Sequence, residues 1–225
     1  IATIILNRPD SLNAINRQLR QELADAIMRF DSDDGARVAV LIHRAALGAL
    51  FLALLANMVF YARYVAGAIA YPFERDYGEG IVWAQLAALG GRGMYTSLHE
   101  YPYLVFHYTP LYHLVSYAAA TIFGDPLATG RVISVVSTAL AGFIVAWIVA
   151  WAAGPDASRQ ERLAAGAASG LLIFAFQPLY QWSALLRVDM LALMLNLAGI
   201  GLFLASLARP RLFYAAQWRF LPYLP

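Results

Sequence analysis

The sequence predicts a mainly α-helical membrane bundle that is preceded by a short β–α–β fragment. Of its 225 residues, 61% are hydrophobic and 13% are charged, whereas a soluble domain is roughly 45–50% apolar. The mean hydropathy is +0.59. Charges are frequent in residues 1–42 and become sparse from Ala45 onward. The chain therefore divides into an N-terminal fragment, 1–42, and a membrane domain, 43–225.

Residues 1–42 have the pattern of a β–α–β unit. An apolar run at residues 1–6 ends before Pro9, which cannot donate a ladder hydrogen bond. Apolar residues then recur at steps of three and four over residues 11–30, which predicts an amphipathic helix. The turn sequence "DSDDG" leads into "ARVAVLI", residues 36–42, where we expect a second strand.

Four apolar runs in the membrane domain are long enough to cross a bilayer, which takes about 20 helical residues. They cover approximately residues 45–70, 133–153, 163–180 and 190–208. Two shorter apolar runs, 81–89 and 111–123, suit interfacial helices at the membrane surface. We therefore expect about four spans and two interfacial helices.

The arginines predict the orientation of this bundle. With four spans, one face receives Arg44, Arg159, Arg162, Arg209, Arg211 and Arg219. Basic residues mark the cytoplasmic face of a membrane protein, so we expect an integral membrane protein whose N-terminus is cytoplasmic. The same count places "ERDYGEG", residues 74–80, and Asp189 together on the non-cytoplasmic side.

The composition also excludes some partners and chemistries. The net charge of +2 gives no basis for nucleic-acid binding, and the lipid bilayer is the expected partner. The absence of cysteine excludes disulfides and thiolate chemistry. Ionisable side chains at the mouth of a span face a cavity, because facing lipid is costly. We therefore expect the carboxylates of Asp76, Glu79 and Asp189 to share one cavity.

Five short motifs occur in order around the apolar segments. They are Asp76-Tyr77-Gly78-Glu79-Gly80, Tyr108-Thr109-Pro110-Leu111-Tyr112, Phe123-Gly124, Gly130-Arg131 and Arg187-Val188-Asp189-Met190-Leu191. Through them, residues 45–209 resemble the N-terminal part of the GT-C class of integral-membrane glycosyltransferases, in particular the bacterial relatives of protein mannosyltransferases and aminoarabinose transferases. The resemblance implies transfer of a sugar from a polyprenyl-phosphate donor to an acceptor on the outer side of a bacterial inner membrane.

The resemblance also implies roles for particular residues. A carboxylate can take the proton of an acceptor hydroxyl as the new bond forms, which suggests Asp76 as the catalytic acid/base and Glu79 as its assistant. Asp189 would bind the acceptor, and Asp76 and Asp189 could instead hold a divalent cation through their oxygen atoms. Arg187 and Arg131 are candidates for the donor phosphate, because a guanidinium suits phosphate oxygens.

The sequence departs from the pattern of the class in two places. Many relatives carry an acid just before the Tyr-x-Pro-Leu motif, and here His107 stands there. His107 could act as a base or a hydrogen-bond donor, or Glu100 could supply the carboxylate. The class also has more spans than this chain, so we expect a truncated transferase that is inactive alone.

The first residues resemble a second, unrelated family. The patterns Leu6-Asn7-Arg8-Pro9 and Leu12-Asn13-Ala14 are similar to the opening of the enoyl-CoA hydratase (crotonase) family. The glycine-rich continuation is missing after Ile42, so no catalytic residue carries over. One alternative function is thus a fragment of a hydratase or isomerase. Another is a non-catalytic membrane protein, although transporters place ionisable residues in mid-span. The junction at residues 42–44 is either a natural fusion or a chimera of two gene fragments.

Overall fold

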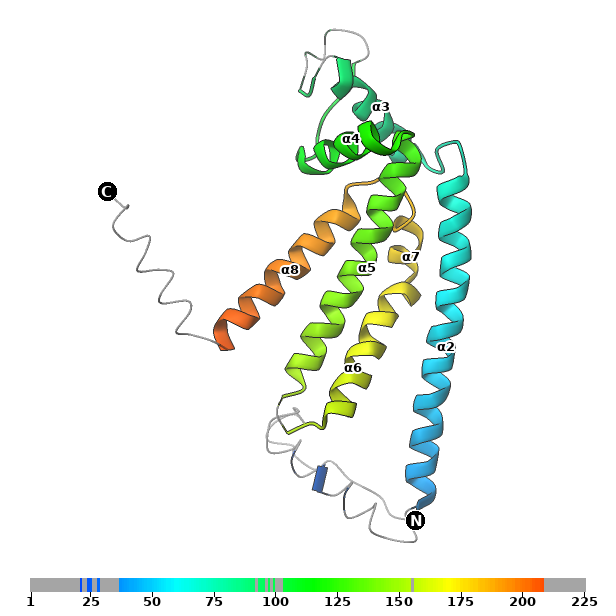
Figure 1. Cartoon of the computed structure of the whole chain (residues 1–225), viewed down its shortest axis with the longest axis vertical. Coiled ribbons are helices and arrows are strands. Elements are labelled where there is room, and N and C mark those ends of the chain that lie inside the picture. Colours follow the sequence, from blue (N-terminus) through cyan, green and yellow to red (C-terminus); the bar gives the residue numbers. More distant parts are fainter. Residues whose placement is uncertain are drawn as a thin grey trace, which may run out of the picture. The chain divides into compact units, whose positions relative to one another are not determined.

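The computed structural model describes residues 37–91, 93–95, 97, 99, 103–154 and 156–208, together with Gln21, Ala24, Asp25 and Met28. The chain forms two compact units, Ile1–Ala53 and Leu54–Pro225. The described residues contain helices, turns and extended connections but no strand. The helices follow the order shown in Figure 1: α2 (Arg37–Ala70), α3 (Tyr77–Gly91), α4 (Leu111–Phe123), α5 (Pro126–Ala152), α6 (Arg159–Leu172), the 3₁₀ helix η3 (Ile173–Ala175), α7 (Gln177–Trp182) and α8 (Asp189–Ala208).

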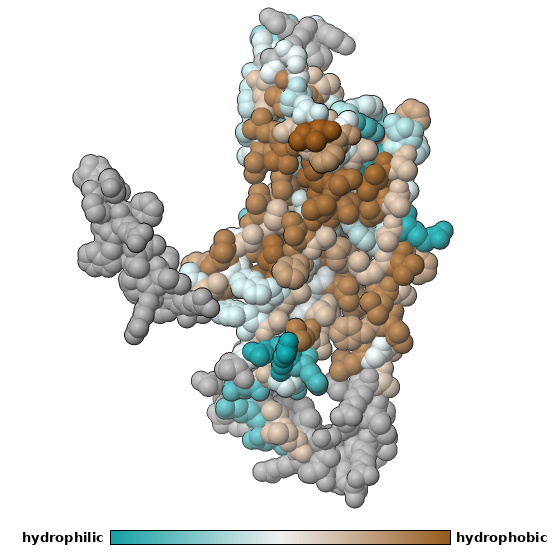
Figure 2. Space-filling model, in the orientation of Figure 1, coloured by the Kyte–Doolittle hydropathy of each residue, from teal (hydrophilic) through white to brown (hydrophobic). Residues whose placement is uncertain are grey.

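Three helical segments are long and apolar enough to cross a membrane. They are Ala45–Ala70, Pro126–Ala152 and Asp189–Leu207. Large apolar side chains such as Phe143 and Leu202, which are 72% and 71% exposed, lie on their outer surfaces. Brown and tan residues accordingly cover most of the coloured surface in Figure 2. Since water disfavours an apolar surface of this extent, the helices indicate a membrane protein.

The predicted second strand of the N-terminal fragment is wrong. Residues 37–42 form the first turns of α2, which continues without interruption to Ala70. No glycine or proline separates these residues from the apolar run that follows, and extending a helix adds one hydrogen bond for each residue that is fixed. The helix predicted over residues 11–30 is helical at its four described residues. The first predicted strand, residues 1–6, lies outside the described residues.

The predicted third span, 163–180, is also wrong as a single helix. Helix α6 ends at Leu172, the 3₁₀ turn follows, and α7 begins at Gln177 with Pro178 as its second residue. A proline has no N–H to donate and its ring collides with the carbonyl four residues earlier, which kinks or breaks a helix before it; here the helix breaks. Figure 1 shows α6 and α7 following one another beside α5, so the chain still returns to the end of α5 that lies near α3 and α4.

Small residues allow α6 to lie close against α5. A Cβ atom added at Gly166 would come within 2.6 Å of the Ala146 carbonyl oxygen, and one added at Gly170 within 2.7 Å of the Gly142 carbonyl oxygen. Glycine and alanine at a spacing of four residues permit this approach between helices in a membrane. The interrupted helix is therefore fixed to α5 by backbone contact.

The two predicted interfacial helices correspond to α3 and α4. Helix α4 covers Leu111–Phe123, the predicted range, and begins after Pro110. Helix α5 follows after one turn, in which the Asp125 carboxylate accepts a hydrogen bond from the Leu127 N–H at 2.9 Å. This is an N-cap, and the proline at the first helical position supports the same start. The short connection places α4 beside the first turns of α5.

A buried apolar cluster joins α3, α4 and α5 to the turn before α8. Its fully buried members are Val82, Leu86, Tyr112, Leu127 and Leu186. The Tyr112 hydroxyl donates to the Gly130 carbonyl oxygen at 3.0 Å, and burial raises the pKa of Tyr112 to about 12. A Cβ atom at Gly130 would lie 1.9 Å from the Leu186 Cδ1 atom. Glycine at position 130 therefore lets the turn before α8 lie against α5.

Candidate functional site

A buried ion pair lies beneath the connection between α2 and α3. The Arg131 Nε and Nη2 atoms donate to the two carboxylate oxygens of Glu79 at 2.8 Å and 2.7 Å. Both side chains have no exposed surface. Glu79 lies in the first turn of α3 and Arg131 in the second turn of α5. Two parallel hydrogen bonds of this kind fix both the distance and the orientation of the pair.

Arg131 also binds the end of α2. Its remaining N–H groups donate to the carbonyl oxygens of Ala68 at 2.7 Å, Phe73 at 2.6 Å, and Tyr71. The last carbonyls of a helix have no partner within the helix, and the guanidinium supplies donors for this end. All five N–H groups of Arg131 are thereby used. The side chain fixes the course of residues 68–73.

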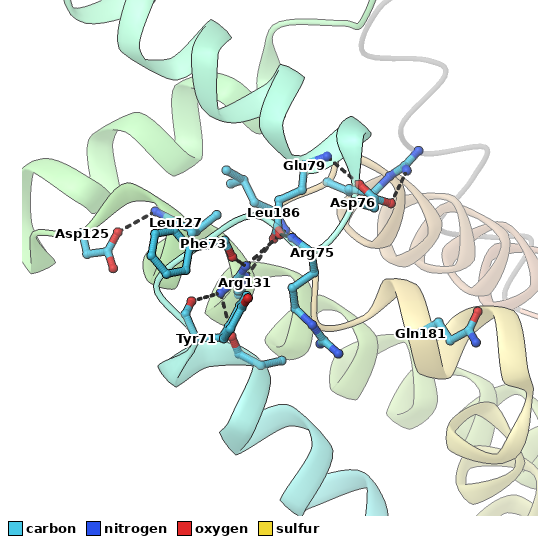
Figure 3. Close-up of polar contacts among 12 residues, drawn as sticks. Tyr71, Phe73, Arg75, Asp76, Glu79, Asp125, Leu127, Arg131, Gln181 and Leu186 are labelled. Carbon is cyan, nitrogen blue, oxygen red and sulfur yellow. Dashed lines mark hydrogen bonds and ion pairs between the residues drawn. The ribbon is translucent and has the colours of Figure 1, made fainter.

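The Glu79 carboxylate also has all of its hydrogen-bonding positions filled. Its Oε1 atom accepts from the Leu186 N–H at 2.7 Å and its Oε2 atom from the Arg75 N–H at 2.8 Å. Together with the two bonds from Arg131, four donors fill the positions that a carboxylate offers. Figure 3 shows these contacts converging on Glu79 and Arg131. The pair therefore joins α2, α3, α5 and the turn before α8.

This burial changes the expectation for two residues. Glu79 was predicted to assist catalysis and Arg131 to meet the donor phosphate. Both are 0% exposed, and their hydrogen-bonding atoms are committed to one another and to the backbone. Neither side chain has a free polar atom that a substrate could reach, so both have a structural role in these contacts.

A second, partly exposed ionic cluster lies next to this pair, and we call it the Asp76–Arg187–Asp189 cluster. The Arg187 Nη1 atom lies 3.2 Å from Asp76 Oδ2, and Arg187 Nε lies 3.0 Å from Asp189 Oδ2. The side chains of Asp76, Arg187 and Asp189 are 32%, 17% and 27% exposed. Two of the three predicted site carboxylates, Asp76 and Asp189, therefore meet at one guanidinium, although 111 positions separate Asp76 from Arg187 in the sequence.

Asp76 has a structural contact as well. Its Oδ1 atom accepts a hydrogen bond from the Glu79 N–H at 2.7 Å. Asp76 precedes the first residue of α3, so this contact is an N-cap. The cap directs the Oδ1 atom toward the helix and leaves the Oδ2 atom facing Arg187, so the fold fixes the orientation of the carboxylate.

The charge of Arg187 is secured by its surroundings. Its guanidinium lies over the Trp182 ring, with 4.8 Å between the guanidinium carbon and the ring centre. Burial opposes the charged form, but hydrogen bonds and charges from Asp189 and Asp76 outweigh it and raise the pKa of Arg187. A cation over an aromatic face is stabilised further. The cluster therefore presents a permanent positive charge between two carboxylates.

The two remaining predicted site residues, His107 and Glu100, are not part of the Asp76–Arg187–Asp189 cluster as the structure describes it. His107 is exposed on the connection before α4, where its Nδ1 atom lies 3.4 Å from the Val105 carbonyl oxygen. Its ring lies 3.9 Å from the Tyr108 ring, measured between centres. The contacts found for the described residues do not connect His107 with the cluster. Glu100 lies outside the described residues.

A buried polar contact between α3 and α4 was not predicted. The His113 Nε2 atom lies 2.8 Å from Gln85 Oε1, and Gln85 Nε2 donates to the Val105 carbonyl oxygen at 2.6 Å. Both side chains are fully buried, and burial lowers the pKa of His113. The signal in the sequence was Gln85 in one short apolar run and His113 in the other, because buried polar groups need partners. This contact ties the connection that carries His107 to α3 and α4.

Asp76 and Asp189 are the predicted candidates for holding a divalent cation. Among the residues that the structure describes, no three His, Cys, Asp or Glu side chains lie together so that they could hold a metal ion. The two aspartates share Arg187 instead. The site thus consists of the partly exposed guanidinium of Arg187 between the partly exposed carboxylates of Asp76 and Asp189.

Comparison with known proteins does not assign the chain to a family. No family model matches it, and no curated protein and no solved structure is significantly similar to it. The candidate function therefore depends on the residues and the geometry of the site.

Proposed function

We propose that the chain is the N-terminal part of a membrane glycosyltransferase that takes a sugar from a polyprenyl-phosphate donor. The observation that carries the proposal is the Asp76–Arg187–Asp189 cluster, in which a guanidinium lies within hydrogen-bond distance of two partly exposed carboxylates. The starts of α3 and α8 carry these residues. The three helices that are long and apolar enough to cross a membrane suit a donor whose polyprenyl chain lies in the bilayer.

Each member of the cluster has a part in this chemistry. The acceptor hydroxyl oxygen forms a bond to the anomeric carbon of the sugar, while the bond between that carbon and the phosphate oxygen breaks and its electron pair leaves with the polyprenyl phosphate. Asp76 takes the proton of the hydroxyl. Arg187 uses Nε and Nη1 for the two aspartates, so its other N–H groups can bind the phosphate oxygens. Asp189 holds Arg187, and its partly exposed carboxylate can also bind the acceptor.

The proposal includes the setting of the protein. Arginines gather at the predicted cytoplasmic ends of the helices, among them Arg159 and Arg162 in the first turn of α6. In Figure 1 the start of α6 lies at the opposite end of the helices from the starts of α3 and α8. The cluster would thus face the non-cytoplasmic side of a bacterial inner membrane, where a lipid-linked sugar and its acceptor meet.

Substitution of Arg187 by glutamine tests donor binding. We expect Arg187→Gln to weaken binding of a polyprenyl-phosphate sugar by roughly 10- to 100-fold, the usual value of a hydrogen bond to a charged group. Binding would be measured by titrating the donor into the full-length protein in lipid nanodiscs. Arg159→Gln is the matched control, because Arg159 is an exposed arginine at the start of α6. Equal donor affinities for the two variants would contradict the assignment.

A further inference from the structure

We propose that Glu79 is a positioning residue that sets the separation between Asp76 and Arg187, with Arg131 fixing Glu79 in place. The proposal rests on the proposed function in one respect: it takes Asp76 and Arg187 to be the residues that act on the substrate. It assigns Glu79 no contact with the substrate.

The geometry joins Glu79 to both sides of the Asp76–Arg187 ion pair. The Glu79 Oε2 atom binds the N–H of Arg75, which precedes Asp76, and Oε1 binds the N–H of Leu186, which precedes Arg187. The Glu79 backbone N–H donates to Asp76 Oδ1 at 2.7 Å. One carboxylate therefore holds the two backbone segments that present the members of the pair.

Arg131 makes this arrangement rigid. A carboxylate on a free side chain would follow the motions of the segments it binds, but Glu79 is held through both of its oxygens by a guanidinium on α5. Because that guanidinium also binds three carbonyl oxygens around the end of α2, neither partner can move alone. Charge-assisted hydrogen bonds of this kind are short and strong.

The Arg187 side of the pair has two further supports on α5. Gly130 lies directly against Leu186, and the Ser134 hydroxyl donates to the Arg187 carbonyl oxygen at 3.3 Å. These contacts fix where the turn before α8 lies on α5. Only Glu79, however, contacts both this turn and the segment that leads into Asp76 among the contacts found for the described residues. Loss of Glu79 should therefore loosen one segment relative to the other.

Thiol labelling tests this inference without any need for turnover. These 225 residues contain no cysteine, so an introduced cysteine supplies the one thiol among them. Ser183 lies in the turn before α8, Ser116 lies on α4, and both are fully buried. In chains that carry Ser183→Cys or Ser116→Cys, we expect Glu79→Gln to raise the labelling rate at position 183 by about tenfold or more and to leave position 116 protected, since local opening exposes only the segment concerned.

Two labelling results would overturn the inference. No change at position 183 would mean that Glu79 does not hold the turn. An equal rise at positions 183 and 116 would mean that the substitution unfolds the whole region and that the effect is not local. The labelling result is independent of the proposed transferase reaction, so it decides the role of Glu79 even if the full-length protein transfers no sugar.

Kinetics distinguish a positioning residue from a second catalytic carboxylate. In a full-length protein that transfers sugar, we expect Glu79→Gln to lower kcat by about 100-fold, which is the effect of a displacement of about 1 Å at a reacting group. The pH profile of the remaining activity should match that of the unaltered protein, since Asp76 still takes the proton. A changed pH profile, or an unchanged kcat, would overturn the assignment.

Discussion

Substitution of Arg131 by methionine is expected to lower the free energy of unfolding by roughly 3–5 kcal/mol, the cost of removing one partner from a buried ion pair. Methionine leaves the Glu79 carboxylate buried without its counter-ion, although the bonds from Arg75 and Leu186 remain. It also removes the donors to the carbonyl oxygens of Ala68 and Phe73. The change should appear in thermal or denaturant unfolding of the protein in lipid–detergent micelles, followed by circular dichroism.

Two further variants give the Arg131 experiment its control. Arg159→Met removes an exposed arginine of α6 and should change stability by less than about 0.5 kcal/mol, as surface substitutions usually do. The double variant Glu79→Gln/Arg131→Met removes the unpaired charge and should be more stable than Arg131→Met alone, because the energies of contacting residues are not additive. If Arg131→Met were as stable as Arg159→Met, loss of Arg131 from the buried pair would not destabilise the fold, and the prediction would be wrong.

Substitution of Asp76 by asparagine is expected to lower the rate of sugar transfer by about 10²- to 10⁴-fold, the contribution of a positioned acid or base. The fold should survive, because asparagine is as good an N-cap as aspartate and can accept the hydrogen bond from the Glu79 N–H. The kcat for release of polyprenyl phosphate in membranes that contain the full-length protein measures the effect, and an unfolding midpoint measured in parallel checks the fold.

The matched control for Asp76→Asn is a neighbouring carboxylate. Glu74 belongs to the same acidic stretch, but it is exposed and precedes α3 by three residues. We expect Glu74→Gln to keep the rate of the unaltered protein. If Asp76→Asn retained full activity, or if Glu74→Gln lost as much as Asp76→Asn, the proton acceptor would have to be another group.

The positions of most helices could be predicted from the sequence, because the length of an apolar run and the positions of prolines are local features of the chain. Helix α4 has the predicted range, since Pro110 and Gly124 interrupt the pattern on either side. The third predicted span failed because average hydropathy does not register the single proline at position 178. The second strand failed because β-branched residues have only a weak preference that neighbouring structure overrides.

The site could be predicted only as a group of residues. The positions of the predicted span ends and of the arginines led to the prediction that Asp76, Glu79 and Asp189 lie on the same side of the membrane. The sequence could not separate Asp76 from Glu79, because their difference is burial. Burial of Glu79 depends on Arg131, which lies 52 positions away on another helix. Such a pairing leaves no periodic signal in the sequence.

One-sided thiol labelling, with and without donor, tests the central claim most directly. The reporters are Tyr77→Cys and Val188→Cys, which flank the cluster and leave its three charged side chains intact; Tyr77 is 84% exposed. Asp156→Cys, at an exposed position between α5 and α6, reports the other face. A membrane-impermeant reagent would be added to either side of vesicles that contain the full-length protein.

We expect positions 77 and 188 to react only from the non-cytoplasmic side and position 156 only from the cytoplasmic side. A saturating polyprenyl-phosphate sugar should slow the reaction at positions 77 and 188 and leave the reaction at position 156 unchanged. Reaction of 77 and 188 from opposite sides, or labelling rates that the donor leaves unchanged, would contradict a donor site at the Asp76–Arg187–Asp189 cluster.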